Sequence, residues 1–401
     1  MPSTTRKTIL SGMRPTGKLH LGHLVGALEN WVRLQEEYDN YHLVADYHAL
    51  TTNPDTSELH RNSVDMVMDW LAAGIDPLRS PMFRQSQIKQ HTELHLILSM
   101  LITAARLERN PAVKDQVRDL QIDNVTYGHL GYPVLQAADI LLYKGDLVPV
   151  GEDQVPHIEM TREIARRFNH LFGKEPGFEE KANAAVKKLG GKRAKAYLDL
   201  RNRYQEKGDQ EALGEGRALL ASSASLSTAD RERLFGYLEG ARRVILAEPT
   251  ARLTETPKLP GLDGQKMSKS YGNALLMRED PKSLTDKVRR MTTDPARVRR
   301  SDAGEPERCP VWSLHQIYTT PEVRDWAANG CRSAGIGCLE CKQPVIEAML
   351  REQDGWRSRA QPYLDDPSLL RSIVADGCDR ARHAAQETMR DVREAMGLAY
   401  T

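Results

Sequence analysis

Two short segments carry groups that could act on phosphate. The first runs from Ser11 to His23 and combines a glycine-containing turn with the start of a helix pattern. Such a turn directs free backbone N–H groups outward at the positive end of a helix, which suits an anion. His20 and His23 lie three residues apart, hence on one helix face, where both can donate hydrogen bonds to phosphate. Gly22 between them leaves room for a planar base.

This first segment has plainer interpretations. An ordinary strand–helix turn with surface histidines would show the same residues. A metal site is disfavoured, because no third ligand lies near His20 and His23.

The second segment is Lys266-Met267-Ser268-Lys269-Ser270, which follows a stretch rich in Gly and Pro. Two lysines that bracket hydroxyl residues on a loop suit a clamp on a polyphosphate, since Lys supplies point charges and Ser supplies further donors. A solvated Lys/Ser loop is the alternative. The two segments in this order are far more specific than either alone.

Together the segments resemble the HIGH and KMSKS signatures of class I aminoacyl-tRNA synthetases. The resemblance is strongest to the bacterial tryptophanyl-tRNA synthetase family. It rests on the segments 11–28, 46–51, 132–143, 150–154, 157–169 and 395–397. It implies a Rossmann-like catalytic domain, a C-terminal helical anticodon-binding domain and a homodimer. The implied reaction joins tryptophan to ATP, releases pyrophosphate, and passes the aminoacyl group to tRNA(Trp), with Mg²⁺ accompanying ATP.

The resemblance also implies residue roles. His20, His23, Lys266 and Lys269 would act on the phosphates. The ATP site would combine residues of both motifs with the turn at 151–153, which follows a strand, and with a backbone contact from Leu259. Its residues would be Arg14, Pro15, Thr16, Gly22, His23, Gly151, Glu152, Asp153, Leu259, Lys266, Met267, Ser268, Lys269 and Ser270.

The implied tryptophan site consists of Tyr132, Gln136, Asp139, His48 and Gln154. Asp139 matches the position that accepts the indole N–H, and an indole has one donor and no acceptor. A substrate without that donor leaves the buried acceptor unpaired, which penalises it strongly. Gln136 stands where many bacterial members have Met, and Tyr132, Gln136 and Asp139 also resemble the substrate helix of tyrosyl-tRNA synthetases. Tyrosine is therefore the alternative substrate.

Four of the five cysteines fall between residues 309 and 341. Four thiolates with a tight closing pair suit a 4Fe–4S cluster or Zn²⁺, and their spacing does not choose between the two. The resemblance implies the cluster rather than Zn²⁺, because some tryptophanyl-tRNA synthetases carry one on a similar quartet. Reduced free thiols are the third interpretation. The four are Cys309, Cys331, Cys338 and Cys341.

A basic run precedes and enters this region, and we expect either a solvated surface or a track for tRNA phosphates. It comprises Lys287, Arg289, Arg290, Arg297, Arg299, Arg300 and Arg308. The whole chain is nearly neutral, with 56 Lys and Arg against 55 Asp and Glu, so contact with nucleic acid requires such a local patch.

The elements that would position these residues read as α/β. Strands are expected near 8–11, 41–46, 81–85 and 147–151, and helices near 20–28, 57–74, 91–106, 157–171 and 367–397. Alternating strands and helices predict a parallel sheet. We expect a Rossmann-like domain over 1–174, a helical insert over 175–248, a return to the catalytic domain over 249–281, and an all-helical domain over 282–401.

Composition limits the remaining classes. Hydrophobic content of 40% in 401 residues indicates a folded protein without a membrane span, and nothing in the sequence suggests export. We therefore expect a cytoplasmic enzyme. The alternatives are a catalytically silent paralogue that binds amino acid or RNA, disfavoured by the intact motifs, and a small-molecule nucleotidylyltransferase, disfavoured by the long helical C-terminal part.

Overall fold

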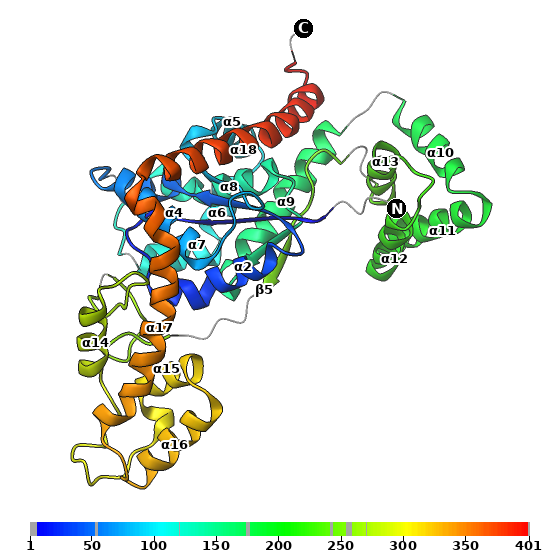
Figure 1. Ribbon diagram of the computed structural model, residues 1–401. Coiled ribbons are helices and arrows are strands. Elements are labelled where there is room, and N and C mark those ends of the chain that lie inside the picture. Colours follow the sequence, from blue (N-terminus) through cyan, green and yellow to red (C-terminus); the bar gives the residue numbers. More distant parts are fainter. Residues whose placement is uncertain are drawn as a thin grey trace. The chain divides into compact units, whose positions relative to one another are not determined.

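The computed structural model describes residues 6–52, 55–119, 121–173, 177–240, 244–253, 259–269 and 271–399 (Figure 1). The chain forms two compact units. The first comprises Met1–Arg6, Ser11–Gln85 and Leu253–Cys378, and the second Lys7–Leu10, Ser86–Arg252 and Asp379–Thr401.

A five-stranded sheet has the order β3-β2-β1-β4-β5. Its strands are β1 (Thr8–Met13), β2 (Asp39–Val44), β3 (Met82–Arg84), β4 (Leu147–Val150) and β5 (Thr250–Leu253). β2 pairs with β3 in parallel, and β1 pairs with β4 in parallel. An order that runs outward from β1 in both directions is that of a Rossmann-like α/β fold, as expected. The strand β5 was not predicted, because it lies at the start of the stretch rich in Gly and Pro that precedes the second motif.

The first unit begins its helical part directly after β1. A continuous helical segment contains α1 (Leu21–His23), the π-helical turn η1 (Leu24–Leu28) and α2 (Glu29–Leu34). Two more helices follow β2, namely α3 (Asp46–Leu50) and α4 (Leu59–Ala73). In the core, Trp31 stacks on His42 with 4.7 Å between their ring centroids, and Trp70 packs edge-on against Trp31.

The later part of the first unit is helical. It contains α14 (Pro281–Arg290), η4 (Pro306–Arg308), α15 (Pro310–Tyr318), α16 (Pro321–Arg332), α17 (Cys338–Asp365) and the start of α18 (Pro367–Met396). Proline opens most of these helices, because its missing N–H would be unpaired there in any case. The long helix α17 packs against α4, where Arg359 Nε donates to the Ala72 carbonyl at 2.6 Å.

The second unit surrounds a buried helix. α8 (Tyr127–Leu142) packs between α5 (Gln90–Ser99) and α9 (Val155–Phe172), with η2 (Gln85–Gln87), α6 (Ala104–Glu108), α7 (Pro111–Asp119) and η3 (Glu152–Gln154) as short neighbouring elements. The single helix expected over 91–106 is two helices, since the chain leaves helical geometry between Ser99 and Ala104.

The insert is helical as expected. It contains α10 (Phe178–Lys188), α11 (Gly191–Lys207), α12 (Gln210–Ala221) and α13 (Thr228–Leu238). Asp209 and Ser227 cap the N-termini of α12 and α13 by accepting hydrogen bonds from backbone N–H groups. The four helices share a core of their own, made of Phe178, Ala182, Ala185, Val186, Leu189, Tyr197, Leu220, Leu226, Leu234 and Leu238.

No helix among the described residues is both long enough and apolar enough to cross a bilayer.

Candidate active site

Backbone pairing brings the two signature motifs together in the first unit. Leu21 N donates to the Leu275 carbonyl at 2.9 Å, and Met277 N donates to the Leu19 carbonyl at 3.0 Å. An isolated antiparallel bridge joins His20 and Leu276 between them. The segment after the second motif is therefore fixed against the start of the first helix.

Lys269 reaches the turn of the first motif. Its Nζ donates to the Thr16 carbonyl at 3.0 Å, and lies 3.3 Å from where a Cβ on Gly17 would stand. Gly17 has a φ of +112°, a conformation that side chains other than glycine rarely adopt. Burial lowers the pKa of Lys269, although the Asp69 carboxylate opposes that effect. A partly desolvated cation thus points into the predicted phosphate turn.

The remaining residues of the second motif differ in exposure. Lys266 is exposed, Met267 is buried, and Ser268 N donates to Asn273 Oδ1 at 2.7 Å. Leu259, the predicted adenine contact, is buried at 5% exposure, and Ser270 lies outside the described residues.

His20 and His23 form a pair whose ring centroids are 3.8 Å apart. His20 N donates to His23 Nδ1 at 3.2 Å. Burial, followed by the nearby Lys269 charge, lowers the pKa of His20 to about 4. Burial, then His20 and Lys269, lowers the pKa of His23 to about 3. Both imidazoles are therefore neutral at pH 7 and can donate a hydrogen bond without carrying charge.

Gly22 has an internal role that the sequence did not indicate. A Cβ at this position would stand 3.0 Å from the His20 ring. Glycine thus allows the His20 ring to lie over the helix, in addition to any room it leaves for a base. Of the other predicted ATP residues in this unit, Pro15 is buried, while Arg14 and Thr16 are exposed. Arg14 Nη1 donates to Thr52 Oγ1 at 3.5 Å.

Sequence reasoning missed a buried ion pair beneath the motifs. Asp69 on α4 is 1% exposed, and it accepts hydrogen bonds from Leu19 N at 2.9 Å and from Arg278 Nε. Arg278 follows the second motif and Leu19 belongs to the first, so one carboxylate ties both to α4. The sequence could have indicated this ion pair, because Asp69 is a carboxylate within the apolar run Met66-Val67-Met68-Asp69-Trp70-Leu71, and a buried carboxylate needs a partner.

In the second unit, Asp139 lies at 3% exposure on α8 with its carboxylate engaged by a histidine. His91 Nδ1 lies 2.6 Å from Asp139 Oδ1, and His91 Nε2 lies 2.7 Å from the Tyr143 hydroxyl. An ionised carboxylate only accepts, so Nδ1 carries the proton and Nε2 accepts from Tyr143. His91 therefore orients the carboxylate expected to bind indole, and nothing in the sequence except its residue type indicated this role.

Two further predicted residues share the helix with Asp139. Tyr132 is buried, with its hydroxyl 2.8 Å from His157 Nε2, and Gln136 is partly exposed. The turn after β4 presents Glu152 and Asp153 as exposed carboxylates beside Gly151, and Gln154 Nε2 donates to Asp153 Oδ2 at 2.9 Å. His48 is partly exposed on α3 of the first unit.

The four cysteines of the quartet lie around the ends of three helices. Cys309 precedes α15, Cys331 ends α16, and Cys338 and Cys341 begin α17. Burial, then the other three thiols, raises the pKa of Cys341 to about 12. His315 Nε2 lies 3.3 Å from Cys341 Sγ.

The quartet does not have the geometry of a metal site. Within the described ranges, no group of three or more His, Cys, Asp or Glu side chains is placed to hold a metal ion. The structure therefore gives no support for a metal ion on the quartet. The thiols are near enough to influence one another, but they are not arranged as a ligand set.

The basic run is only partly available to RNA. Arg297 is 8% exposed and donates to the carbonyls of Arg300 and Ile336, so it has a structural role. Lys287 pairs with Glu279, and Arg308 pairs with Asp294. Arg289, Arg290, Arg299 and Arg300 remain exposed.

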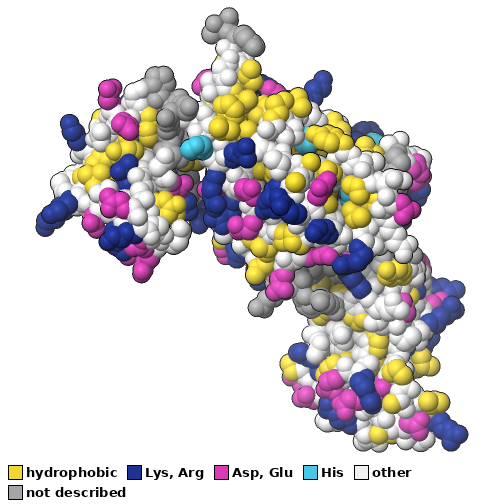
Figure 2. Space-filling model, turned by 180° about the vertical axis from the view of Figure 1, so that it is seen from behind, with side chains coloured by type: hydrophobic (Ala, Val, Ile, Leu, Met, Phe, Trp, Pro, Cys, Tyr) yellow, Lys and Arg dark blue, Asp and Glu magenta, His cyan; other side chains and the backbone are white. Residues whose placement is uncertain are grey.

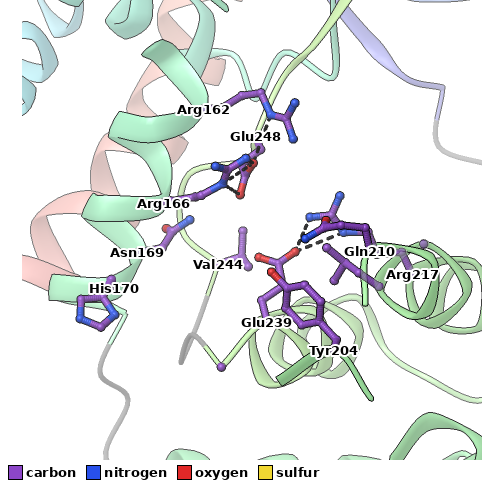
Figure 3. A pocket seen from close by; sticks show the side chains of 13 residues that line it. Arg162, Arg166, Asn169, His170, Tyr204, Gln210, Arg217, Glu239, Val244 and Glu248 are labelled. Carbon is purple, nitrogen blue, oxygen red and sulfur yellow. Dashed lines mark hydrogen bonds and ion pairs between the residues drawn. The ribbon is translucent and has the colours of Figure 1, made fainter. Parts of the chain in front are cut away.

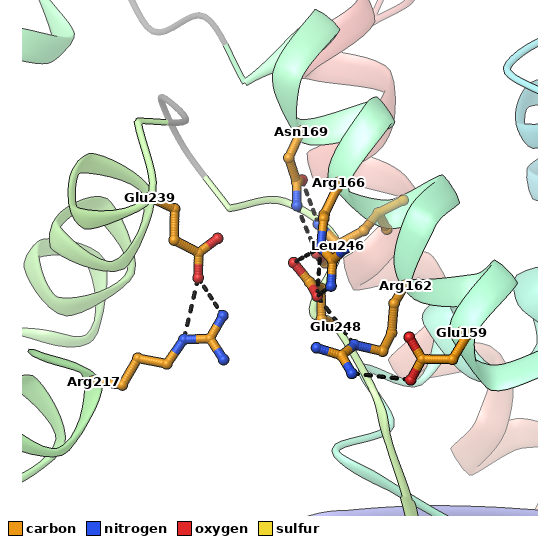
Figure 4. Close-up of polar contacts among 8 residues, drawn as sticks. All are labelled: Glu159, Arg162, Arg166, Asn169, Arg217, Glu239, Leu246 and Glu248. Atoms are coloured by element: carbon orange, nitrogen blue, oxygen red, sulfur yellow. Dashed lines mark hydrogen bonds and ion pairs between the residues drawn. The ribbon is translucent and has the colours of Figure 1, made fainter. Parts of the chain in front are cut away.

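A cavity of about 460 Å³ lies between α9 and the insert helices (Figure 3). Its charged groups neutralise one another, as Figure 4 shows: Glu248 accepts from Arg162 and Arg166, and Glu239 accepts from Arg217. Asn169 fixes the wall by donating to the Leu246 carbonyl at 2.8 Å. None of the predicted site residues lines this cavity, so it is separate from the signature motifs.

Comparison with known proteins agrees with this geometry. The family model described as tRNA synthetases class I (W and Y) matches residues 2–193 and 233–351. A tryptophan–tRNA ligase of Ralstonia nicotianae is 63% identical over 395 residues, covering 98% of this chain and 99% of the relative. A tryptophan–tRNA ligase of Thermotoga maritima is 42% identical, with 98% and 99% covered.

Solved structures agree as well. The tryptophanyl-tRNA synthetase of Campylobacter jejuni, crystallised with ADP and tryptophan, superposes with a TM-score of 0.72 at 27% identity, covering 98% of this chain and all of that one. A tyrosyl-tRNA synthetase of Archaeoglobus fulgidus, at 19% identity and a TM-score of 0.55, covers 89% of this chain and 91% of its own, and shares the fold. With the family model matching most of its residues and both signature motifs joined in one unit, the chain belongs to the class I tRNA synthetases of the tryptophan and tyrosine type.

Proposed function

We propose that this protein is a tryptophan–tRNA ligase. The observation that carries the proposal is 63% identity to a tryptophan–tRNA ligase across 98% of the chain, together with intact signature motifs. In the first step, the tryptophan carboxylate attacks the α-phosphate of ATP and pyrophosphate leaves. In the second step, the aminoacyl group passes from the adenylate to the 3′ end of tRNA(Trp).

In this proposal the first unit acts on the phosphates. Lys269 supports such a role, because it is already directed at the turn containing Thr16 and its ammonium is partly desolvated. Charge that develops on phosphate in the transition state would be stabilised by Lys269 and by neutral His20 and His23. Lys266, exposed on the same loop, would add a second positive charge when the loop meets the nucleotide.

The second unit would supply amino-acid selectivity through Asp139. Burial and the His91 contact support this role, since a fixed carboxylate oxygen suits the single donor of an indole. Tyr132, Gln136, Gln154 and His48 would complete the amino-acid site. Gly151, Glu152 and Asp153 follow a parallel strand, which is where a carboxylate meets a ribose hydroxyl in such folds.

Mg²⁺ would accompany the ATP phosphates and neutralise their charge. The residues of both motifs fit an ion carried by the nucleotide, because they offer cations and N–H donors rather than carboxylate ligands. Arg14, Pro15, Thr16 and Gly22 would shape the ATP site together with the loop from Lys266 to Ser270.

A 4Fe–4S cluster on the four cysteines of the quartet stays a prediction from the resemblance. We assign it no role in catalysis. Mutual proximity of the four thiols supports it, and their lack of ligand geometry opposes it. Anaerobically prepared, iron-replete protein would show a broad absorption near ~400 nm if the cluster forms. Colourless protein with four titratable thiols would refute it.

We also propose a homodimer and a cytoplasmic enzyme with separate catalytic, insert and C-terminal helical regions. Exposed apolar side chains on α5 and directly after it support the dimer, since Leu96 and Met100 are 58% and 69% exposed. Leu94 and Leu98 on the same helix are fully buried and belong to the core. Light scattering at micromolar concentration tests the dimer, and a monomer would contradict it.

Amino-acid-dependent exchange of pyrophosphate into ATP tests the proposed function. We expect exchange with tryptophan and at most a trace with tyrosine. Equal rates for the two amino acids would contradict the choice of tryptophan. No exchange with either amino acid would favour the catalytically silent paralogue.

A further inference from the structure

Basic residues gather at the turn that joins α10 to α11 in the insert. Five of the nine residues from 187 to 195 are Lys or Arg and none is acidic, namely Lys187, Lys188, Lys192, Arg193 and Lys195. All five are exposed, and Figure 2 shows basic side chains projecting from the surface of the insert. We call these five residues and the Leu189–Gly191 backbone between them the basic turn.

Two of the five charges serve the insert itself. Lys188 Nζ pairs with Asp230 Oδ2 at 2.6 Å, and Arg193 Nη1 donates to Ser223 Oγ at 3.4 Å. Lys187, Lys192 and Lys195 make no hydrogen bond or ion pair with any described residue. Three exposed positive charges are therefore left without a local counter-charge at one turn.

The backbone of the basic turn has a glycine that the fold does not explain. Gly190 has a φ of +80°, so the turn itself favours glycine there. Gly191 has no positive φ, and no atom lies within 4 Å of the place where its Cβ would stand. Glycine lowers helix stability relative to alanine. The missing side chain at Gly191 instead leaves the first backbone N–H groups of α11 open to an approaching group.

These N–H groups add to the charge of the lysines. α11 is 17 residues long, it has no side-chain cap at its N-terminus, and its first turn contains no acidic residue. The positive end of its dipole is thus neither capped nor neutralised.

The basic turn is also held rigidly. Leu189 and Val186 are buried in the insert core, and the hydroxyl of buried Tyr197 donates to the Leu234 carbonyl at 2.7 Å. A turn fixed in advance loses little conformational freedom when it binds.

We propose that the basic turn binds the phosphodiester backbone of tRNA. Separated charges on two helices match a chain of successive phosphates better than a single phosphate group. This inference rests on the proposed function for the identity of the RNA.

The test measures binding of a tRNA(Trp) transcript to the full-length protein between 50 and 200 mM salt. Each phosphate contact contributes about 0.7–0.9 to the slope of log K against log salt concentration. Combining Lys187→Ala, Lys192→Ala and Lys195→Ala should make the slope shallower by about 2 and weaken binding about 10-fold or more at 100 mM salt. Gly191→Ala should weaken binding several-fold while leaving the melting temperature unchanged or raised.

Lys207→Ala is the matched control. Lys207 is an exposed lysine at the opposite end of α11, so its loss removes the same single charge from the same helix as Lys192→Ala alone. It should change affinity by less than about 2-fold and the slope by less than 1. Tryptophan-dependent pyrophosphate exchange should be unchanged in every variant, because adenylate formation needs no tRNA.

Two results would overturn the inference. One is parental affinity and slope in both the triple variant and Gly191→Ala. The other is a loss in Lys207→Ala as large as that in Lys192→Ala alone, which would indicate general electrostatic attraction. Failure of the proposed function would show separately, as absence of exchange with tryptophan in the parent protein.

Discussion

Lys269→Ala gives the sharpest test of the phosphate site. The side chain lies 3.0 Å from the Thr16 carbonyl, inside the turn that would hold the phosphates. A unit charge about 4 Å from a developing negative charge contributes about 4 kcal/mol at an effective dielectric constant of 20. Removing one such group from an active site typically costs about 2.7–4 kcal/mol. Lys269 also gives up its hydrogen bond to Thr16, worth about 1 kcal/mol, when it turns to the phosphate, so the net loss of transition-state stabilisation in the variant is smaller by that amount. We therefore expect kcat to fall about 10²-fold.

The assay is tryptophan-dependent pyrophosphate exchange over a range of ATP concentrations. We expect kcat to fall much more than the KM for ATP rises, because the charge acts mainly in the transition state. Lys18→Ala is the control: Lys18 is exposed, directly follows Gly17, and makes no hydrogen bond with the described residues. It should change kcat less than about 3-fold, well below one power of ten. A change in KM alone for Lys269→Ala, or equal losses in both variants, would refute the reasoning.

Three further predictions follow from other contacts. Asp139→Asn should lower kcat/KM for tryptophan about 10–100-fold, because a charged hydrogen bond contributes about 1.5–3 kcal/mol, and an unchanged value would remove Asp139 from the indole site. Burial, then the Glu29 charge, raises the pKa of Glu352 to about 7, above its unfolded value of about 4.5. Its protonated form therefore stabilises the fold fully below pH 4.5, and that stability is lost as pH rises through 7. In the parent protein, the free energy of unfolding should fall by about 1–2 kcal/mol between pH 5 and pH 8, a figure already reduced for solvent screening. Glu352→Gln should remove this fall, and denaturant titrations of both proteins at the two pH values would show it. Cys341→Ser should impair tRNA charging or stability and leave pyrophosphate exchange intact, whereas loss of exchange would place the quartet in the first step.

The sequence predicted most elements that have a strong periodic pattern. Strands β1 to β4 and helices α4, α9 and α18 lie where they were expected, within a few residues. β5 was missed because its four residues, Thr250–Leu253, show no alternation that distinguishes a strand from a loop. The break after Ser99 was missed because the apolar pattern continues through Leu101 and Ile102 without Gly or Pro.

For the site, the motifs indicated the residues expected to contact a ligand, but they did not indicate the residues that position those side chains. Lys269 and the first turn meet as the paired motifs suggested. Asp69 and Arg278 were missed because they are separated widely in sequence and neither belongs to a motif. His91 was missed because its partnership with Asp139 is a tertiary contact between α5 and α8. For the quartet, the spacing suggested a ligand set, but no group of three or more His, Cys, Asp or Glu among the described residues is placed to hold a metal ion, so the cluster stays a prediction.

The most direct measurement is acylation of tRNA by the purified protein. Transcripts of tRNA(Trp) and tRNA(Tyr) would each be incubated with ATP, Mg²⁺ and either tryptophan or tyrosine, and the esterified amino acid identified by mass. The proposed function predicts tryptophan on tRNA(Trp) and no product in the other three combinations. Tyrosine on tRNA(Tyr), or no esterified amino acid on either RNA, would contradict it.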